Sequence, residues 1–128
     1  MTQIRISYAA DLLGVSDDTV RRWIDQGQLT AFPDDSGRQV IDGAELAHFA
    51  QERANSERPH GTSARNAFTG LVTKVVSDQV MSSVELQCGP YRVMALVSTE
   101  AVKDLGLAPG SIATARIKAT NVVVDRQD

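Results

Sequence analysis

The sequence of 128 residues contains a single cysteine, Cys88, and two histidines, His48 and His60. A lone cysteine cannot form an internal disulfide or a multi-cysteine metal site, and two histidines do not make a classical zinc site. The sequence therefore excludes a disulfide-stapled scaffold and predicts no bound metal cation. We interpret Cys88 as a small residue within a strand.

Long hydrophobic runs are also absent. No stretch approaches the roughly 18 consecutive apolar residues that a membrane span needs. The first residues, MTQIRISY, lack the basic-then-apolar layout of a signal peptide. We therefore expect a cytoplasmic protein that does not contact a membrane.

An excess of positive charge is missing as well. Thirteen lysines and arginines face 16 aspartates and glutamates, which gives a formal net charge of −3. This balance argues against nucleic-acid binding driven by total charge. Any contact with DNA must come from locally placed arginines.

Catalytic patterns are not found either. We see no Ser/His/Asp or Cys/His pairing and no phosphate-cradling glycine loop, and the carboxylates are scattered without an acid/base partner at a suggestive spacing. We therefore expect a binding protein and not an enzyme.

Two short helices with a tight turn between them are predicted near the start of the chain. Ser7 and Ser16 are each placed to cap a helix. Gly14 and Val15 lie between them, a length that matches the turn of a helix-turn-helix, where glycine supplies the unusual backbone angles.

The second helix has one apolar face. Val20, Trp23 and Ile24 recur at near-helical spacing, so we expect them to be buried. The other faces then carry polar side chains, among them Thr19, Arg21 and Arg22.

A hairpin and a third helix complete this half. Two short β-prone runs, residues 29–32 and 39–41, flank the turn-forming residues 33–38 and predict a wing. Asp42 is placed to cap a helix from Gly43 to about Arg53. Residues 1–53 are thus predicted to form a winged helix-turn-helix domain.

The second half has a different texture. Residues 54–62 have almost no apolar content and carry Pro and Gly, so they predict a linker. Beyond it, β-rich runs at residues 69–76, 81–88, 91–97 and 111–124 are interrupted by one short helix from 99 to about 105. We expect a small β-barrel or sandwich over residues 63–126, and an α+β fold for the whole chain.

The first domain resembles the MerR and excisionase-like winged helix-turn-helix family. The resemblance lies in residues 9–13, Gly14-Val15-Ser16, residues 19–23 and Gly27-Gln28-Leu29. It implies that the second helix offers its first turn to the major groove of double-stranded DNA. The expected DNA-binding residues are Ser16, Thr19, Arg21 and Arg22 on this helix and Arg38 on the wing.

A structural alternative exists for the two helix arginines. Arg21 and Arg22 are spaced so that they can pair with Asp17, Asp18 or Asp25 on a solvated helix face. The aspartates at the start of this helix would also repel phosphate.

Two later segments, residues 62–66 and 115–122, combine hydroxyls, cations and small residues and contain no Asp or Glu. A tetrahedral oxyanion presents acceptors only, so Arg, Lys, Ser, Thr and backbone N–H groups complement it, whereas a carboxylate would repel it. The alternative is that Arg65 and Lys118 are ordinary surface charges.

Residues 62–124 resemble the molybdate-binding Mop (molbindin) domain of the TOBE group. Ser63-Ala64-Arg65-Asn66 and Ile117-Lys118-Ala119-Thr120 carry the resemblance. It implies an OB-like β-barrel that assembles into dimers or larger rings and binds oxyanions between subunits. Several members carry Ser where this chain has Ala101, which removes one hydroxyl. The residues expected to contact the anion are Ser63, Ala64, Arg65, Ser98, Lys118, Ala119 and Thr120.

Together the two resemblances predict a molybdate-responsive transcriptional regulator, in which molybdate or tungstate bound by the second domain changes the affinity of a homo-oligomer for its operator. The alternative is an intracellular molybdate store or buffer in which the helix-turn-helix serves as an assembly element. The acidic character of the first half motivates this alternative.

Overall fold

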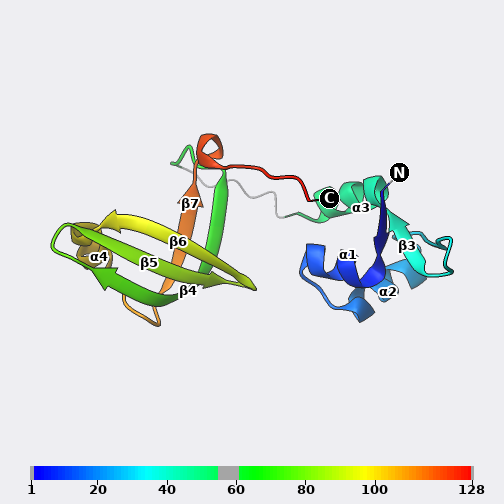
Figure 1. The fold of residues 1–128 in the computed structure, drawn as a ribbon, viewed down its shortest axis with the longest axis horizontal. Coiled ribbons are helices and arrows are strands. Elements are labelled where there is room, and N and C mark those ends of the chain that lie inside the picture. Colours follow the sequence, from blue (N-terminus) through cyan, green and yellow to red (C-terminus); the bar gives the residue numbers. More distant parts are fainter. Residues whose placement is uncertain (1, 55–60, 128) are drawn as a thin grey trace. The chain divides into compact units, whose positions relative to one another are not determined.

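The structure, a computed structural model, describes residues 2–54 and 61–127. The chain divides into two compact units, residues 1–57 and 58–128, here called the N-terminal and C-terminal units (Figure 1). Each unit has its own hydrophobic core. The linker predicted at residues 54–62 falls largely on residues 55–60, which lie outside the described residues.

The three helices predicted in the N-terminal unit are present: α1 (Ile6–Leu13), α2 (Asp17–Asp25) and α3 (Gly43–Arg53). Helix α2 begins as expected, because the Ser16 hydroxyl caps it by accepting the Thr19 N–H at 3.2 Å. Gly14 ends α1 with a φ of 69°, a left-handed conformation that favours glycine.

The predicted cap at Ser7 is wrong. Helix α1 begins earlier, at Ile6, and its N-cap residue is Arg5, which provides no side-chain cap. The reason is that a strand, β1 (Gln3–Arg5), leads directly into the helix, so Ser7 already lies in the first turn.

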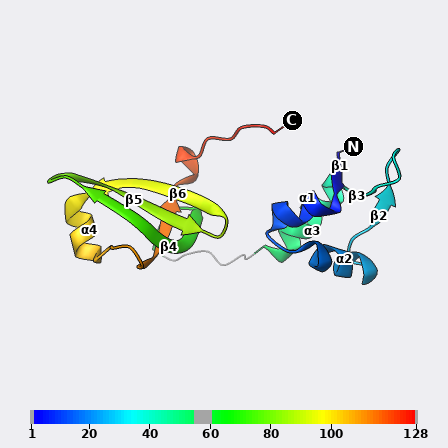
Figure 2. The same ribbon diagram turned by 60° about the horizontal axis from the view of Figure 1, so that its bottom comes forward.

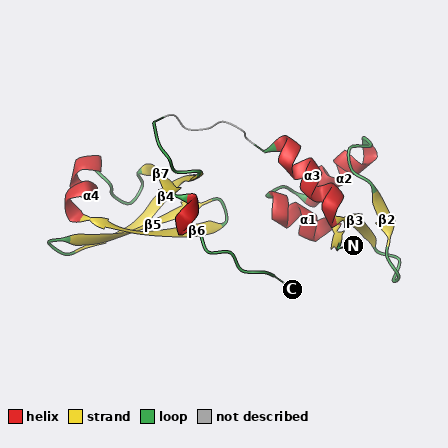
Figure 3. Cartoon of the chain, turned by 90° about the horizontal axis from the view of Figure 1, so that it is seen from above, coloured by secondary structure: helices red, strands yellow, loops and turns green. Residues whose placement is uncertain are grey.

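Strand β1 joins two others in a small antiparallel sheet of order β1-β3-β2. The predicted wing is the hairpin of β2 (Ala31–Pro33) and β3 (Gln39–Asp42). Figure 3 shows the three helices gathered together with the strands at one side of them. Core side chains come from both, namely Ala9, Ala10, Val20, Trp23, Leu29, Ile41, Leu46 and Phe49.

The C-terminal unit is a four-stranded antiparallel sheet of order β6-β5-β4-β7 (Figure 1, Figure 2). Its elements are β4 (Asn66–Ser77), β5 (Met81–Cys88), β6 (Tyr91–Ser98), α4 (Thr99–Leu105), β7 (Ile112–Ile117) and the short 3₁₀ turn η1 (Ala119–Asn121). The sheet curls into a half-barrel in which β6 and β7 are the two edges. The expected α+β class is confirmed, and the OB-like barrel takes this open form.

One predicted strand is too long. The run at residues 111–124 was expected to be extended throughout, but β7 ends at Ile117 and the chain turns into η1. Asn121 and Val122 donate their N–H groups to the carbonyls of Lys118 and Ala119, which closes the turn. Local turn formation here overrides the β propensity of the valines that follow.

The sheet curls because β4 pairs with two different strands along its length. Its first half pairs with β7 and its second half with β5, and Leu71 pairs with both Gln87 and Ile112. Gly70 precedes the residue at which β4 changes partner. A Cβ added there would lie 2.3 Å from the backbone oxygen of Gln87 and 2.6 Å from Cys88 Sγ. Only glycine allows the strands to approach so closely.

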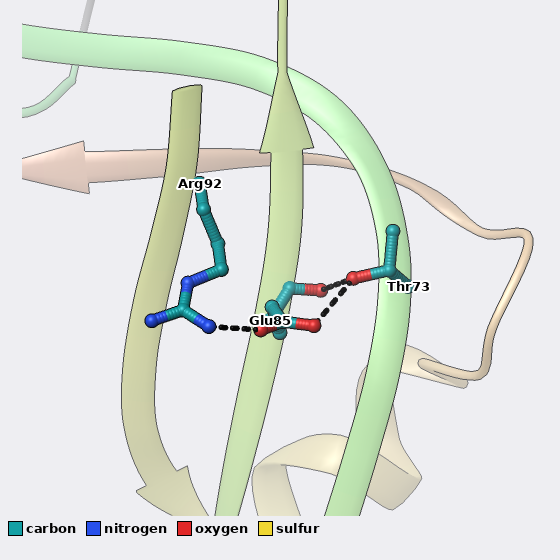
Figure 4. Close-up of polar contacts among 3 residues, drawn as sticks. All are labelled: Thr73, Glu85 and Arg92. Carbon is teal, nitrogen blue, oxygen red and sulfur yellow. Dashed lines mark hydrogen bonds and ion pairs between the residues drawn. The ribbon is translucent and has the colours of Figure 1, made fainter. Parts of the chain in front are cut away.

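A bulge in β4 follows directly, between Val72 and Lys74. Figure 4 shows how it is held: the Thr73 hydroxyl donates to the Glu85 carbonyl at 3.2 Å and contacts Glu85 Oε2 at 3.0 Å. Glu85 Oε1 in turn accepts from Arg92 Nη1 at 3.0 Å. These contacts tie β4, β5 and β6 together where the sheet bends.

Candidate functional sites

Helix α2 presents the predicted DNA-binding side chains on its solvent side. Arg21 and Arg22 are exposed, while Val20 and Trp23, which flank them in the sequence, are buried in the core. Ser16 Oγ is 2.9 Å from Thr19 Oγ1 and also accepts the Thr19 N–H. Both hydroxyls are therefore already engaged at the start of the helix. The exposed side chains of Arg21 and Arg22 remain as hydrogen-bond donors for a ligand.

The predicted ion-pair alternative is not seen. Within residues 2–54, the structure shows no ion pair between Arg21 or Arg22 and Asp17, Asp18 or Asp25; the one ion pair in this part of the chain joins His48 and Glu52. Both guanidinium groups therefore remain available to an external anion.

The wing is held rigid at its tip. Asp34 Oδ1 accepts the N–H groups of Ser36 and Arg38, each at 2.9 Å, and the Ser36 hydroxyl at 2.9 Å. The Arg38 N–H, followed by the Ser36 hydroxyl and N–H, holds the pKa of Asp34 below its usual value. The turn thereby fixes the backbone from which the exposed Arg38 side chain projects.

Arg21 and Arg38 are brought together by the fold. Both line one open notch of about 320 Å³ between α2, the wing and the start of α1. Ser16, Thr19 and Arg22 are not among its lining residues. A third arginine, Arg5, also lines the notch. Sequence reasoning missed it because the three-residue strand β1 gives too short a pattern to detect.

In the C-terminal unit, strand pairing brings the two predicted anion-binding segments together. Asn66, the first residue of β4, pairs with Ile117, the last of β7. The Asn66 Nδ2 also donates to the Ile117 carbonyl at 3.2 Å. Consequently residues 62–65 leave the sheet beside residues 118–120, at the end of the sheet where η1 lies (Figure 1).

The donors at this end complement an anion. The side chains of Arg65 and Lys118 are exposed, and η1 starts at Ala119, so its first N–H groups have no partner within the turn. Ala64 is buried, and its N–H donates to the Thr62 hydroxyl at 3.1 Å. The Arg65 Nη1 makes one long contact, 3.4 Å, to the Thr62 carbonyl. No acidic residue occurs in residues 61–73 or 105–124.

Ser98 is not brought to this end. It pairs with Met81, the first residue of β5, next to the Ser77 end of β4, so it lies at the opposite end of the long curved strand from Asn66. The Ser98 hydroxyl caps α4 by accepting the Ala101 N–H at 3.1 Å. Within one chain, therefore, Ser98 cannot share an anion with Arg65 and Lys118.

An apolar groove of about 480 Å³ opens along the inside of the half-barrel, lined by residues of β6, α4 and β7. Its walls include Val93, Val97, Leu107 and Ala113. On the edge strands, Leu96 is 71% exposed and Ile112 is 74% exposed. Among the described residues, β6 and β7 pair with one neighbouring strand each, and each exposes a large apolar side chain.

Within residues 2–54 and 61–127, no group of three or more His, Cys, Asp or Glu residues is arranged to hold a metal ion. No helix in these ranges is long and apolar enough to cross a membrane.

Each of the two units matches a known domain family. Residues 4–54 match a helix-turn-helix domain model and residues 62–124 match the TOBE domain model. A curated relative, Molybdenum-pterin-binding protein 3 of Clostridium pasteurianum, is 36% identical over 63 residues, which cover 48% of this chain and 93% of the relative.

Two solved structures are similar to the C-terminal unit. A molybdate-binding protein from Sporomusa ovata has a TM-score of 0.50 and 31% identity, covering 51% of this chain and 97% of that one. The cytoplasmic molybdate-binding protein ModG, described with molybdate bound, has a TM-score of 0.47 and 39% identity, covering 53% of this chain and 47% of that one.

These matches define a helix-turn-helix domain followed by a TOBE domain. The chain belongs to the TOBE-domain family, and its C-terminal unit is a homologue of the molybdenum-pterin-binding proteins. Both resemblances drawn from the sequence are confirmed at this level.

Proposed function

We propose that this protein is a molybdate-responsive, DNA-binding transcriptional regulator of the cytoplasm, without catalytic activity. The observation that carries the proposal is the convergence of residues 62–65 and 118–120 at one end of the half-barrel, in a chain that also holds a helix-turn-helix. Its domains are residues 1–53 and 63–126, joined by a linker at 54–62.

The donor set fits molybdate or tungstate. The Arg65 and Lys118 cations supply charge, and the Ser63 and Thr120 hydroxyls donate hydrogen bonds. The small side chain of Ala119 leaves the backbone N–H groups at the start of η1 approachable, and Ala64 packs beneath this end of the sheet. Neither segment contains Asp or Glu, so neither brings a carboxylate that would repel a dianion. Curated and structural relatives named for molybdenum or molybdate binding support this ligand.

The proposed anion site needs a second copy of the chain to contain all of its expected residues. Because Ser98 lies far from Arg65 and Lys118 within one chain, it joins them only if a neighbouring subunit supplies it. The unpaired edges β6 and β7 and the apolar groove between them offer the surface for such an assembly. We therefore propose a homo-oligomer, a dimer or a ring of dimers.

DNA binding is assigned to Ser16, Thr19, Arg21 and Arg22 on α2 and Arg38 on the wing. Exposed arginines without ion pairs on α2 support this assignment within the described residues. Helix dimensions suit insertion of α2 into the major groove, with the wing beside it on the backbone.

The variant Arg22→Ala tests base reading. If Arg22 contacts guanine, its loss weakens binding to a selected duplex by about tenfold and relaxes sequence preference, since a bidentate pair contributes about 1–3 kcal/mol of discrimination. Binding of wild type and variant to a randomised duplex library, followed by sequencing, measures both effects. A variant with unchanged affinity and unchanged preference would remove Arg22 from the reading surface.

Regulation requires that anion and DNA binding be coupled. Molybdate bound between subunits would fix the spacing of paired helix-turn-helix units and so shift operator affinity, with a coupling of typically fivefold or more. Footprinting on duplexes selected from a random pool, with and without molybdate, tests this step.

A molybdate store or buffer is the second candidate. The acidic residues Asp17 and Asp18 on the first turn of α2 favour it, because they oppose a close approach to phosphate. It predicts a large oligomer with several anions and no sequence-selective DNA binding, which the same duplex selection would reveal.

A further inference from the structure

We propose that Arg5 is a further DNA-contacting residue, which forms with Arg21 and Arg38 a clamp for one phosphate of the DNA backbone. The inference rests on the proposed DNA binding and deepens it. The DNA contacts argued above come from α2 and the wing, whereas Arg5 belongs to a strand at the start of the chain.

Three different elements bring the arginines together. Arg5 is the last residue of β1 and pairs with Val40 of β3, which places it beside the base of the wing. Arg38 immediately precedes β3, and Arg21 lies on α2. All three line the same notch of about 320 Å³, together with Ile6, Ser7, Asp17 and Gln39.

The charge in this notch is unbalanced. Three arginines and one acidic residue, Asp17, line the notch, and a second carboxylate, that of Asp34, lies near Arg5 on the wing. All three arginines are exposed, and none of them forms an ion pair within residues 2–54. Like charges gathered without a direct ion pair repel one another, and an anion bound between them would relieve this repulsion.

A second observation shows that Arg5 faces the wing. Its positive charge contributes to lowering the pKa of Asp34, after the larger effects of the Arg38 N–H and the Ser36 donors. The guanidinium of Arg5 is thus close enough to act on the turn that carries Arg38. Arginines from β1, the wing and α2 thus line the same notch.

The shape and donors of the notch favour a phosphodiester. The Ser7 hydroxyl and the Gln39 amide add neutral donors beside the arginines. The notch is open to solvent and lies next to the helix proposed to enter the major groove, where backbone phosphates run alongside the bases. Contacts of this kind fix the position of the protein on DNA and carry no sequence information.

The test uses the full-length protein and a 30-base-pair duplex of random sequence, with affinity measured by fluorescence anisotropy over a series of salt concentrations. Each phosphate neutralised contributes about 0.9 to the slope of log affinity against log salt. We expect Arg5→Gln to weaken binding about fivefold to tenfold at low salt, equally for all sequences. The slope should fall by no more than about 0.9, because Arg21 and Arg38 still contact the shared phosphate. Arg5→Lys should retain the slope.

Lys103→Ala is the matched control, because it removes one positive charge from an exposed position of α4 in the other unit. It should leave the slope unchanged. If wild type binds the duplex and Arg5→Gln binds it with wild-type affinity at low salt, the clamp is overturned while DNA binding stands. If wild type binds no duplex even at low salt, the proposed DNA binding itself fails. An Arg5→Gln effect confined to particular sequences would contradict a phosphate contact.

Discussion

Replacing both Arg65 and Lys118 by alanine is expected to lower molybdate affinity by about a hundredfold or more. Each cation supplies a charge-assisted hydrogen bond to the anion, and the loss of one such bond costs about tenfold or more in affinity. The two residues stand on segments that the Asn66–Ile117 pairing brings together. Isothermal titration with sodium molybdate, with sulfate present as a competitor, measures the change.

The matched control is the double variant Lys74→Ala with Lys103→Ala. It removes the same number of positive charges from exposed positions of the same unit, away from residues 62–65 and 118–120. We expect wild-type molybdate affinity. Equal loss in both double variants would mean that only total charge matters, and unchanged binding by the Arg65 and Lys118 variant would place the anion elsewhere.

Replacing Gly70 by alanine is expected to destabilise the C-terminal unit by about 3 kcal/mol, at the upper end of the cost of overpacking. The added Cβ would lie 2.3 Å from the Gln87 carbonyl oxygen, and a backbone atom cannot move aside as a flexible side chain can. Either β4 separates from β5 or the curl of the half-barrel opens. Chemical denaturation followed by circular dichroism measures the loss.

Gly89→Ala is the control that separates the two effects of replacing a glycine, namely steric overlap with a neighbouring strand and strain in the backbone. Gly89 has a φ of 58°, and a Cβ there would meet no atom within 4 Å. Its replacement should cost only the strain of a left-handed residue, about 1 kcal/mol. A Gly70→Ala protein as stable as Gly89→Ala would show that the strands tolerate the extra atom, contrary to the packing described here.

Local patterns predicted much of the fold. The cap at Ser16, the turn glycine Gly14 and the helix ended by Gly106 are encoded in a few neighbouring residues, and each has the predicted role. The hairpin around residues 33–38 is likewise local. Such signals need no knowledge of distant parts of the chain.

What sequence reasoning missed depends on contacts between distant residues. Strand β1 is stabilised by pairing with β3, more than thirty residues later, and its own three residues carry no periodicity. The end of β7 at Ile117 depends on a turn that competes with a β-prone sequence. The separation of Ser98 from Arg65 follows from strand order, which the motif positions alone do not give.

The proposed regulation is tested most directly by measuring the affinity of the full-length protein for a selected duplex with and without saturating molybdate, at constant ionic strength. We predict a change of at least about fivefold for wild type, and none for the Arg65→Ala, Lys118→Ala double variant. Equal affinity of the wild type in both conditions, in a protein shown by titration to bind molybdate, would contradict a molybdate-responsive regulator.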